Sequence, residues 1–223
     1  MNKHPREFQI RQGANLPHWR LDGAIYAVTF RLADSLPAEV LDQWRREREH
    51  IVDRAADLGR TISEHESERL AELHSDRIEQ WLDQGSGSCM LREARFALLV
   101  RDAMLHFDGQ RYDLHAWCIM PNHVHAVLRT REGVDLSSVL HSWKSFTGTR
   151  IRLALGGMGA VWQKESYDHV VRGEADWRAQ VRYVAENPAR AGLVGWPWVW
   201  RCGERVPLAS WGSKDTAAEG GAT

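Results

Sequence analysis

The feature that most constrains the fold is a pair of strand-like segments joined by a two-residue turn near the middle of the chain. Residues 112–120 (YDLHAWCIM) and 123–128 (HVHAVL) have the density of apolar and β-branched residues that predicts strands. Pro121-Asn122 between them is a turn-forming dipeptide. We therefore expect a β-hairpin, which requires an antiparallel sheet.

Further strands and helices are expected on both sides of this hairpin. Residues 23–32 and 167–172 predict two more strands. Residues 136–155 predict a helix with Asp135 as its N-cap, and Glu174 to Glu186 predict a second helix that Pro188 ends.

The segment between the first strand and the hairpin has a different character. From about residue 38 to residue 107 it is rich in Glu, Arg, Ala and Leu, with apolar residues at helical intervals. This pattern predicts a helical elaboration: two helices broken near Gly59, and a further helix over residues 91–107. The order strand, helices, hairpin, helix, strand and helix predicts an α+β fold, with an antiparallel sheet covered on one face by helices.

Length and composition favour a single domain. The chain has 223 residues, of which 43% are hydrophobic and 26% charged, enough for one sizeable core but cramped for two. We expect residues 1–212 to form this domain. Residues 213–223, rich in Gly, Ala and charge, are expected to be a mobile tail.

Cysteine usage and hydropathy indicate the cellular compartment in which the protein is expected. Cys89, Cys118 and Cys202 are odd in number and form no CxxC pair, so neither a disulfide framework nor a structural zinc site is indicated. The N-terminal residues form no apolar leader, and no run of about 18 apolar residues occurs. We expect a cytoplasmic protein with no membrane partner.

Charge is unevenly distributed, although the formal net charge is only −1. Residues 41–80 carry seven Lys/Arg against eleven Asp/Glu, a net of −4, whereas residues 142–205 carry ten against six, a net of +4. A phosphate-binding surface is therefore expected in the second half, although such an asymmetry is also found on ordinary solvated surfaces.

His123 and His125 are the first candidates for a functional site. Side chains alternate along a strand, so both imidazoles project from one face while Val124 points to the other, into the core. Two imidazoles so placed can share one divalent cation. The alternative is a pair of surface or core histidines.

The last predicted helix carries a second candidate. Trp177, Val181 and Val184 form its apolar stripe, whereas Tyr183 and Asn187, four residues apart, share a different face. A tyrosine one turn from an amide oxygen fits a nucleophile beside a metal ligand, and the alternative is a packing tyrosine. The other three tyrosines lie in predicted strands.

Three motifs resemble one known family. The segments Met120–Leu128 (MPNHVHAVL), Trp162–Arg172 (WQKESYDHVVR) and Tyr183–Val194 (YVAENPARAGLV) are similar to those of the REP-associated tyrosine transposases. These belong with the single-tyrosine transposases of the HUH endonuclease superfamily. The resemblance extends from about Gly23 to Trp200, and the helical segment over residues 38–107 departs from it.

The resemblance implies a fold, the ferredoxin-like HUH-nuclease sandwich, and a reaction mechanism. His123, His125 and Asn187 would bind a divalent metal, Mg²⁺ or Mn²⁺, and Tyr183 would attack single-stranded DNA to leave a 5′-phosphotyrosine and a free 3′-hydroxyl. The expected partner is a short palindromic hairpin in single-stranded DNA, bound by a monomer or a homodimer.

Several residues are candidates for other roles in this chemistry. His169, on the strand before the tyrosine helix, is a candidate general base. Trp143 and the cluster Trp196–Trp200 are candidates for stacking on bases, whereas Trp117 and Trp177 are expected in the core. The candidate phosphate contacts are Lys144, Arg150, Arg152, Lys164, Arg172 and Arg190.

Other functions are compatible with the same motifs. One is a non-catalytic or domesticated regulatory protein that binds hairpin DNA, and another is a nickase of the relaxase or replication-initiator type. A metal-binding or RNA-binding α+β domain is a third.

Overall fold

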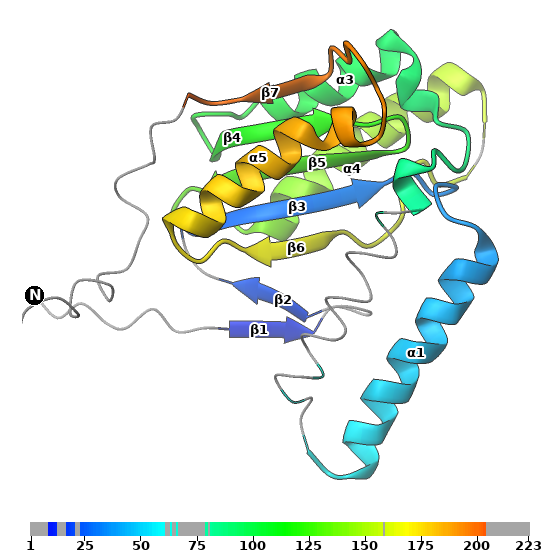
Figure 1. Cartoon of the computed structure of the whole chain (residues 1–223), viewed down its shortest axis with the longest axis vertical. Helices are drawn as coiled ribbons and strands as arrows, with labels where there is room; N and C mark the ends of the chain where they lie inside the picture. Colours follow the sequence, from blue (N-terminus) through cyan, green and yellow to red (C-terminus); the bar gives the residue numbers. More distant parts are fainter. Residues whose placement is uncertain are drawn as a thin grey trace, which may run out of the picture.

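A five-stranded antiparallel sheet forms the centre of the computed structural model (Figure 1). The structure describes residues 9–12, 17–20, 23–60, 63, 66, 79, 81–157 and 159–203. The strand order is β6-β3-β5-β4-β7. The strands are β3 (Ile25–Arg31), β4 (Tyr112–Ile119), β5 (His123–Thr130), β6 (Tyr167–Val170) and β7 (Val199–Arg201). The predicted α+β class and the hairpin are confirmed.

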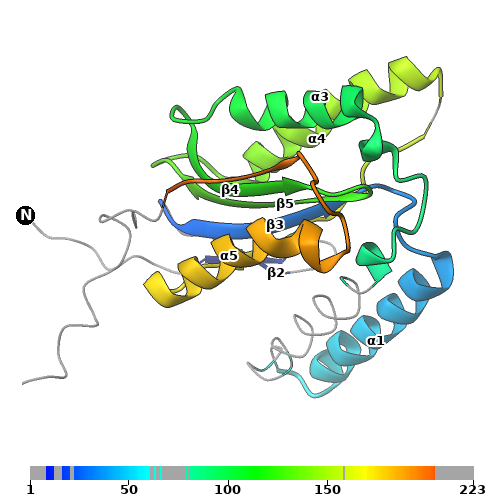
Figure 2. The same cartoon turned by 45° about the horizontal axis from the view of Figure 1, so that its top comes forward.

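Helices cover both faces of this sheet. Helices α3 (Ala94–Leu105) and α4 (Leu136–Leu155) pack on one face, and α5 (Glu174–Arg190) packs on the other (Figure 2). With α3 and α4, strands β3 to β6 follow the ferredoxin-like order predicted from the resemblance. The expectation of helices on one face only was wrong, because neighbouring residues such as Ile25 and Tyr26 are both buried, each on its own face.

The core under α3 and α4 contains Trp143, which the sequence suggested as a base-stacking residue. Trp143 is 2% exposed, and its indole N–H donates to the Tyr112 hydroxyl at 2.8 Å. That hydroxyl donates in turn to the Met104 carbonyl at 2.6 Å. The stacking prediction for Trp143 was therefore wrong, since its ring and its only polar atom are both engaged inside the protein.

The tryptophan cluster near the C-terminal end of the described chain forms a sheet edge that the sequence did not predict. Strand β7 pairs with β4, and the indole N–H of Trp196 donates to the Ile119 carbonyl at 2.8 Å. Trp200 is 42% exposed on this edge. With three residues, β7 is too short to give an alternating pattern in the sequence.

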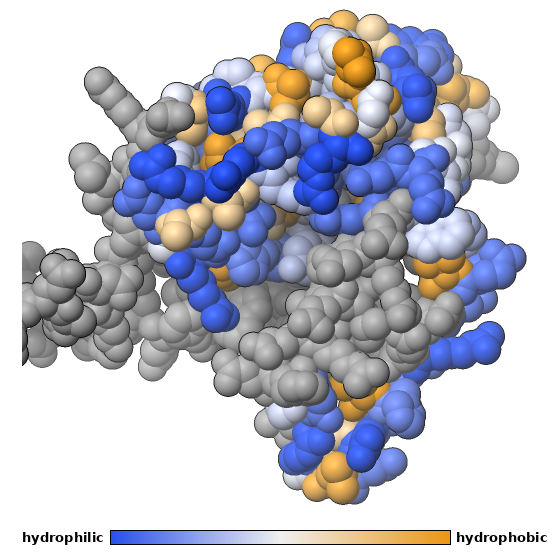
Figure 3. All heavy atoms as spheres, in the orientation of Figure 1, coloured by the Kyte–Doolittle hydropathy of each residue, from blue (hydrophilic) through white to orange (hydrophobic). Residues whose placement is uncertain are grey.

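Helix α5 continues past Pro188, which was expected to end it. Proline cannot donate the backbone hydrogen bond of a helix interior, and Pro188 lies only two residues before the helix ends at Arg190. The last turn is closed by backbone bonds from Ala191 to Asn187 and from Leu193 to Pro188, at 3.0 and 2.8 Å. Arg190 therefore stays in helical register with Tyr183. The outer side of α5 is hydrophilic (Figure 3) and includes the Glu174–Arg178 ion pair at 2.8 Å.

The predicted helical elaboration is described only in part. Helix α1 (Ala38–Asp57) ends just before Gly59 and extends away from the sheet. Most of residues 61–80 lie outside the described residues, as does the tail over residues 213–223. Residues 91–107 divide into the 3₁₀ turn η1 (Met90–Arg92) and α3.

Two strands near the N-terminus were not predicted. β1 (Gln9–Gln12) and β2 (Pro17–Arg20) form a separate antiparallel pair. Within the described ranges, no helix combines the length and the apolar character that crossing a membrane requires.

The burial of Trp143 leads to a stability prediction. Trp143→Ala should lower the free energy of unfolding by about 3–5 kcal/mol, because it leaves a large cavity and removes the indole N–H that donates to the Tyr112 hydroxyl. Trp200→Ala, at the exposed edge, should cost about 1 kcal/mol or less. Urea denaturation followed by circular dichroism measures both, and equal losses would contradict this description of the core.

Candidate functional site

His123 and His125 lie side by side on β5, on the face of the sheet that α5 covers. They are 1% and 2% exposed, and their Nε2 atoms are 2.9 Å apart. Val124 between them is fully buried in the opposite core, as the strand alternation predicted. The hairpin thus directs two imidazoles to one point.

Hydrogen bonds define the protonation of His123. The amide nitrogen of Asn122 donates to the carbonyls of Leu82 and Ser86, at 3.1 and 3.0 Å. Its Oδ1 therefore faces His123 Nδ1 as an acceptor, at 2.7 Å. The proton of neutral His123 is consequently on Nδ1, and the lone pair of Nε2 points toward His125.

His125 is oriented by the neighbouring strand. Its Nδ1 lies 2.8 Å from the Thr29 hydroxyl, which is its register partner on β3. With a proton on Nδ1, His125 would also present the lone pair of Nε2. Partners on the far ring nitrogen are the usual means by which proteins fix imidazoles as metal ligands.

Burial keeps both imidazoles neutral. Desolvation lowers the pKa of His123 well below its ordinary value, and the proximity of His125 and the charge of Arg31 lower it further. Desolvation, followed by the charge of Arg190, lowers the pKa of His125 to about 3. Neutral imidazole is the form that binds metal ions, so the pair is in its ligating form at neutral pH.

Helix α5 presents Tyr183, Asn187 and Arg190 at intervals of four and three residues, on the side that faces β5. The half-buried Tyr183 ring meets the His125 ring edge to face, with centroids 5.6 Å apart. The Arg190 guanidinium lies 4.9 Å from the Tyr183 ring centroid. Tyr183 thus stands between an imidazole and a cation.

Asn187 is buried one turn beyond Tyr183. It is 1% exposed, and its Oδ1 has no hydrogen-bond partner among the described residues. A buried amide oxygen without a partner is costly unless something else binds it. This atom fits the third metal ligand that the resemblance implies. The described residues contain no cluster of three His, Cys, Asp or Glu side chains that could bind a metal.

The environment of Tyr183 favours its neutral hydroxyl. Burial raises the pKa of Tyr183, and a hydrogen bond to the Glu79 carboxylate and its charge raise it further, while Arg190 opposes them. At neutral pH the phenol therefore retains its proton, and attack on phosphorus would require an acceptor for it.

Three residues at this site were not identified from the sequence. Arg31 is the register partner of His123 and stays cationic although burial lowers its pKa to about 10. Thr29 and Arg31 are polar residues two positions apart, so they share one face of an otherwise apolar strand. This pattern could have indicated a polar site on that face. Asn122 looked like a turn residue only. Glu79 had no distinguishing feature among the eleven acidic residues of residues 41–80.

Among the predicted phosphate contacts, Arg190 lies over the Tyr183 ring, and its charge acts on His125. Lys144 donates to the Lys164 carbonyl at 2.8 Å and to the Ser166 hydroxyl at 3.1 Å, and burial with the charge of Arg31 lowers its pKa to about 8. Lys144 thus anchors the loop before β6, and Lys164 contributes its carbonyl there.

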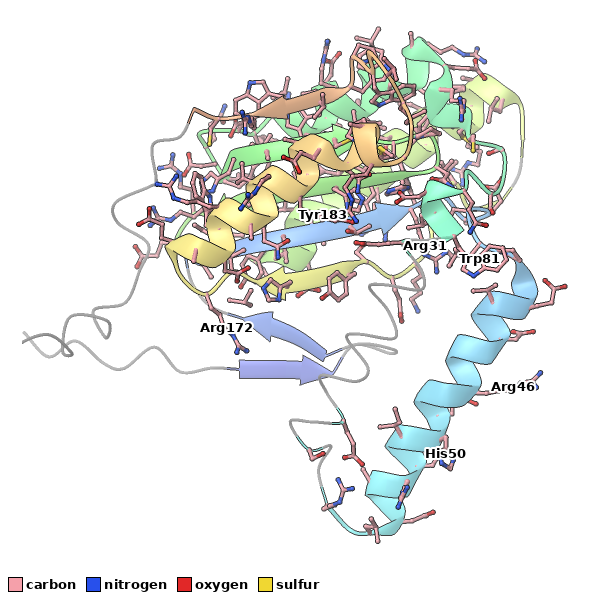
Figure 4. The ribbon with its side chains drawn as sticks, viewed as in Figure 1. Arg31, Arg46, His50, Trp81, Arg172 and Tyr183 are labelled. Atoms are coloured by element: carbon pink, nitrogen blue, oxygen red, sulfur yellow. The ribbon has the colours of Figure 1, made fainter. Side chains whose placement is uncertain are left out.

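The other predicted contacts lie away from this site. Arg150 stacks on Phe146 and, like Arg152, is exposed on α4, which covers the opposite face of the sheet. Arg172 lies toward one end of α5, whereas Arg31 and Trp81 lie toward the other end of the sheet with Tyr183 between (Figure 4).

His169 does not lie beside Tyr183. Its Nε2 is 3.0 Å from the Asp176 carboxylate in the first turn of α5. Seven residues separate Asp176 from Tyr183, roughly 10 Å along the helix axis. The suggestion that His169 is the general base is therefore not supported by its position.

Comparisons with known proteins agree with the motifs. Residues 104–187 match the family model described as "Transposase IS200 like". The "REP-associated tyrosine transposase" of Escherichia coli (strain K12) is 27% identical over 104 residues, which are 44% of this chain and 61% of that protein. The match thus spans about three fifths of the curated relative. These two findings confirm the resemblance to the REP-associated tyrosine transposases that the motifs predicted.

Two solved structures are also similar. One is titled "Structure of the REP associates tyrosine transposase bound to a REP hairpin", with a TM-score of 0.46 and 18% identity, covering 89% of this chain and 82% of that one. The other is a putative transposase from Deinococcus radiodurans, with a TM-score of 0.34 and 12% identity, covering 84% and 97%.

The buried histidines lead to a pH prediction. Burial lowers the pKa of His115 to about 4 and that of His125 to about 3, whereas unfolded histidine titrates near ~6.5. Below pH ~6.5 the unfolded chain binds protons that the folded chain does not, so stability falls as pH is lowered from 7 toward 4. Denaturation midpoints in urea at pH 7.5, 6 and 5 measure this. Stability that does not change over this pH range would contradict the prediction.

Proposed function

We propose that this protein cuts and rejoins single-stranded DNA through a covalent bond between Tyr183 and a 5′-phosphate, a proposal that the match of residues 104–187 to the IS200-like transposase model supports. The observation that carries the proposal is the contact of the Tyr183 ring with His125 of the histidine pair, at 5.6 Å between ring centroids. A nucleophile next to two ligating imidazoles is the arrangement that metal-assisted phosphoryl transfer requires.

We propose His123, His125 and Asn187 as the ligands of a divalent cation, Mg²⁺ or Mn²⁺. Two Nε2 atoms at 2.9 Å and a buried amide oxygen without a partner suit such an ion. When bound, the ion would polarise the scissile phosphate and stabilise the charge that develops on it.

In the proposed reaction, the Tyr183 oxygen forms a bond to phosphorus while the bond from phosphorus to the 3′-oxygen breaks. The products are a 5′-phosphotyrosine and a 3′-hydroxyl. The phosphotyrosine keeps the energy of the broken bond, so a 3′-hydroxyl can reverse the step and join strands without ATP. The edge-to-face contact with His125 limits the directions that the tyrosine ring can take, which favours in-line attack.

Two cations would bind the phosphates next to the scissile bond. Arg190 lies over the Tyr183 ring, and Arg31 is the register partner of His123, so they flank the proposed reaction centre from α5 and β3. Guanidinium groups suit phosphate oxygens because they present several N–H donors in one plane. Both would also stabilise charge in the transition state.

We propose short hairpin repeats with unpaired flanks as the substrate. The support is the family resemblance together with the name of the curated relative, which refers to REP elements. Such a substrate supplies both a folded shape to bind and a single strand to cut.

Incubating the protein with a labelled hairpin, its single-stranded flanks and Mn²⁺ tests the chemistry. A covalent protein–DNA band on a denaturing gel is expected, and Tyr183→Phe, His123→Ala and EDTA should each abolish it. Asn187→Ala should reduce it about 10–100-fold, the range expected when metal binding is weakened. Cleavage that survives Tyr183→Phe would assign the nucleophile elsewhere. Tight binding without cleavage would favour a regulatory DNA-binding module.

The salt dependence of binding distinguishes a DNA contact at Arg190 on α5 from a DNA contact at Arg150 on α4. Arg190→Ala should weaken binding of the single-stranded flank and reduce the slope of log Kd against log salt by about 0.7, the value for one phosphate contact on a single strand. Arg150→Ala, altered on α4, should leave the slope unchanged. Fluorescence anisotropy at four salt concentrations measures both, and the reverse result would move the DNA to the α4 face.

A further inference from the structure

Asn122 connects the histidine pair to a segment that lies far from it in the sequence. Its side chain is fully buried, and its amide nitrogen donates to the carbonyls of Leu82 and Ser86, which are 40 and 36 positions earlier in the chain. Its Oδ1 lies 2.7 Å from His123 Nδ1. One amide group thus joins the end of the helical elaboration to the ring of a proposed metal ligand.

Both polar atoms of this amide have partners inside the protein. The nitrogen donates its two N–H bonds to carbonyls, which leaves the oxygen for the imidazole of His123. The backbone carbonyl of Asn122 also accepts from the Leu32 N–H at the end of β3, at 2.9 Å. A buried amide with all its partners is rigid and takes a single orientation. The His123 ring therefore meets an acceptor in a fixed position, which limits its rotation.

The segment that binds the amide, residues 82–91, is attached to the sheet independently of the histidines. The Ser88 backbone N–H donates to the Asp34 carboxylate at 2.8 Å. The Leu91 N–H donates to the Pro121 carbonyl at the hairpin turn, at 3.1 Å. These contacts hold in place the two carbonyls that the amide binds.

Gly87 is the point at which this segment packs most closely on the sheet. A Cβ atom at Gly87 would collide with the backbone of Asp34, and its φ of 85° is a conformation that favours glycine. Gly87 follows Ser86, whose carbonyl binds the Asn122 amide. A side chain at Gly87 is therefore expected to force the segment away from Asp34 and to draw the Ser86 carbonyl away from the amide.

The two imidazoles of the pair are oriented in different ways. Thr29, which contacts His125 Nδ1, belongs to the adjacent strand, so the sheet itself orients that ring. The His123 ring is oriented from outside the sheet, through Asn122 and the carbonyls of residues 82–86. A displacement of this segment should therefore disturb His123 and leave His125 in place.

From these contacts we infer that Asn122 and the 82–91 segment are positioning elements of the metal site, an inference that rests on the proposed function. The segment holds the amide, the amide holds the His123 ring, and the ring directs its Nε2 atom toward the proposed cation. Partners on the far nitrogen of a ligating imidazole typically change metal affinity about 10–100-fold. The helical elaboration, in which the sequence departs from the family resemblance, thereby controls how tightly the chain binds its metal.

Titration of the full chain with Mn²⁺, followed by electron paramagnetic resonance, measures this affinity without DNA or turnover. Asn122→Ala should raise the Kd for Mn²⁺ about 10–100-fold, and Gly87→Ala should raise it about threefold or more. Gly133→Ala is the matched control. Its φ of 73° is equally unfavourable for alanine, but no described atom lies within 4 Å of the added Cβ. Its Kd should therefore stay within about twofold of the unaltered chain.

The double variant tests whether Gly87 acts through Asn122. If the segment acts through the amide, Gly87→Ala adds nothing to the loss caused by Asn122→Ala, so the two effects are not additive. Saturating Mn²⁺ should also restore the rate of covalent-complex formation in Asn122→Ala, whereas a general loss of structure would not be reversed. Urea denaturation shows which variants are folded, and Gly87→Ala against Gly133→Ala decides the matter if Asn122→Ala does not fold.

Two outcomes would overturn the inference: a Kd for Mn²⁺ that folded Asn122→Ala raises by less than about threefold, or equal effects of Gly87→Ala and Gly133→Ala. In either case, loss of Mn²⁺ binding in His123→Ala leaves the proposed metal ligands intact. If His123→Ala binds Mn²⁺ as tightly as the unaltered chain, the proposed metal site itself fails, and the inference fails with it.

Discussion

The meeting of two imidazoles on one buried face of β5 is the constraint on which the site depends. His123 and His125 are desolvated, and their Nε2 atoms lie 2.9 Å apart. Asn122 fixes the proton of His123 on the far nitrogen, so lone-pair density is directed into the space between the rings. Buried polar atoms so arranged are stable when they share a proton or a cation, which is why the pair suits a metal.

The rest of the fold brings other groups to this pair. Strand β3 contributes Thr29 and Arg31 as register partners of the histidines. On the other side, α5 buries Trp177, Val181 and Val184 in the sheet and thereby presents Tyr183 and Arg190 to the site. A single α-helix and two adjacent strands therefore supply the proposed nucleophile, the proposed metal ligands and the two cations.

Local patterns predicted much of this arrangement. Side chains alternate every two residues along the hairpin strands, which predicted that His123 and His125 share a face. The 3.6-residue repeat of the helix predicted that Val184 and Tyr183 lie on different faces. Both periodicities follow from backbone geometry alone. The last turn of α5 and the edge strand β7 were not predicted. Tertiary contacts stabilise the helix at Pro188 and the short strand Val199–Arg201, and local propensity alone does not favour either.

Residues that act through long-range pairing could not be predicted from the sequence. Glu79 is 104 positions from Tyr183, and nothing in the acidic segment distinguishes it from its neighbours. Trp143 looked like a stacking residue because a sequence does not reveal that its indole N–H meets Tyr112. Arg150 and Arg152 belong to the basic half of the chain, but they lie on the helix that covers the other face of the sheet.

The most direct test of the central claim is to identify the residue that becomes attached to DNA. After reaction with a hairpin substrate and Mn²⁺, nuclease trimming, trypsin digestion and tandem mass spectrometry locate the nucleotide phosphate on the peptide chain. The arrangement of α5 over the histidine pair predicts an adduct on Tyr183. An adduct on Tyr167, or on any residue outside α5, would contradict it.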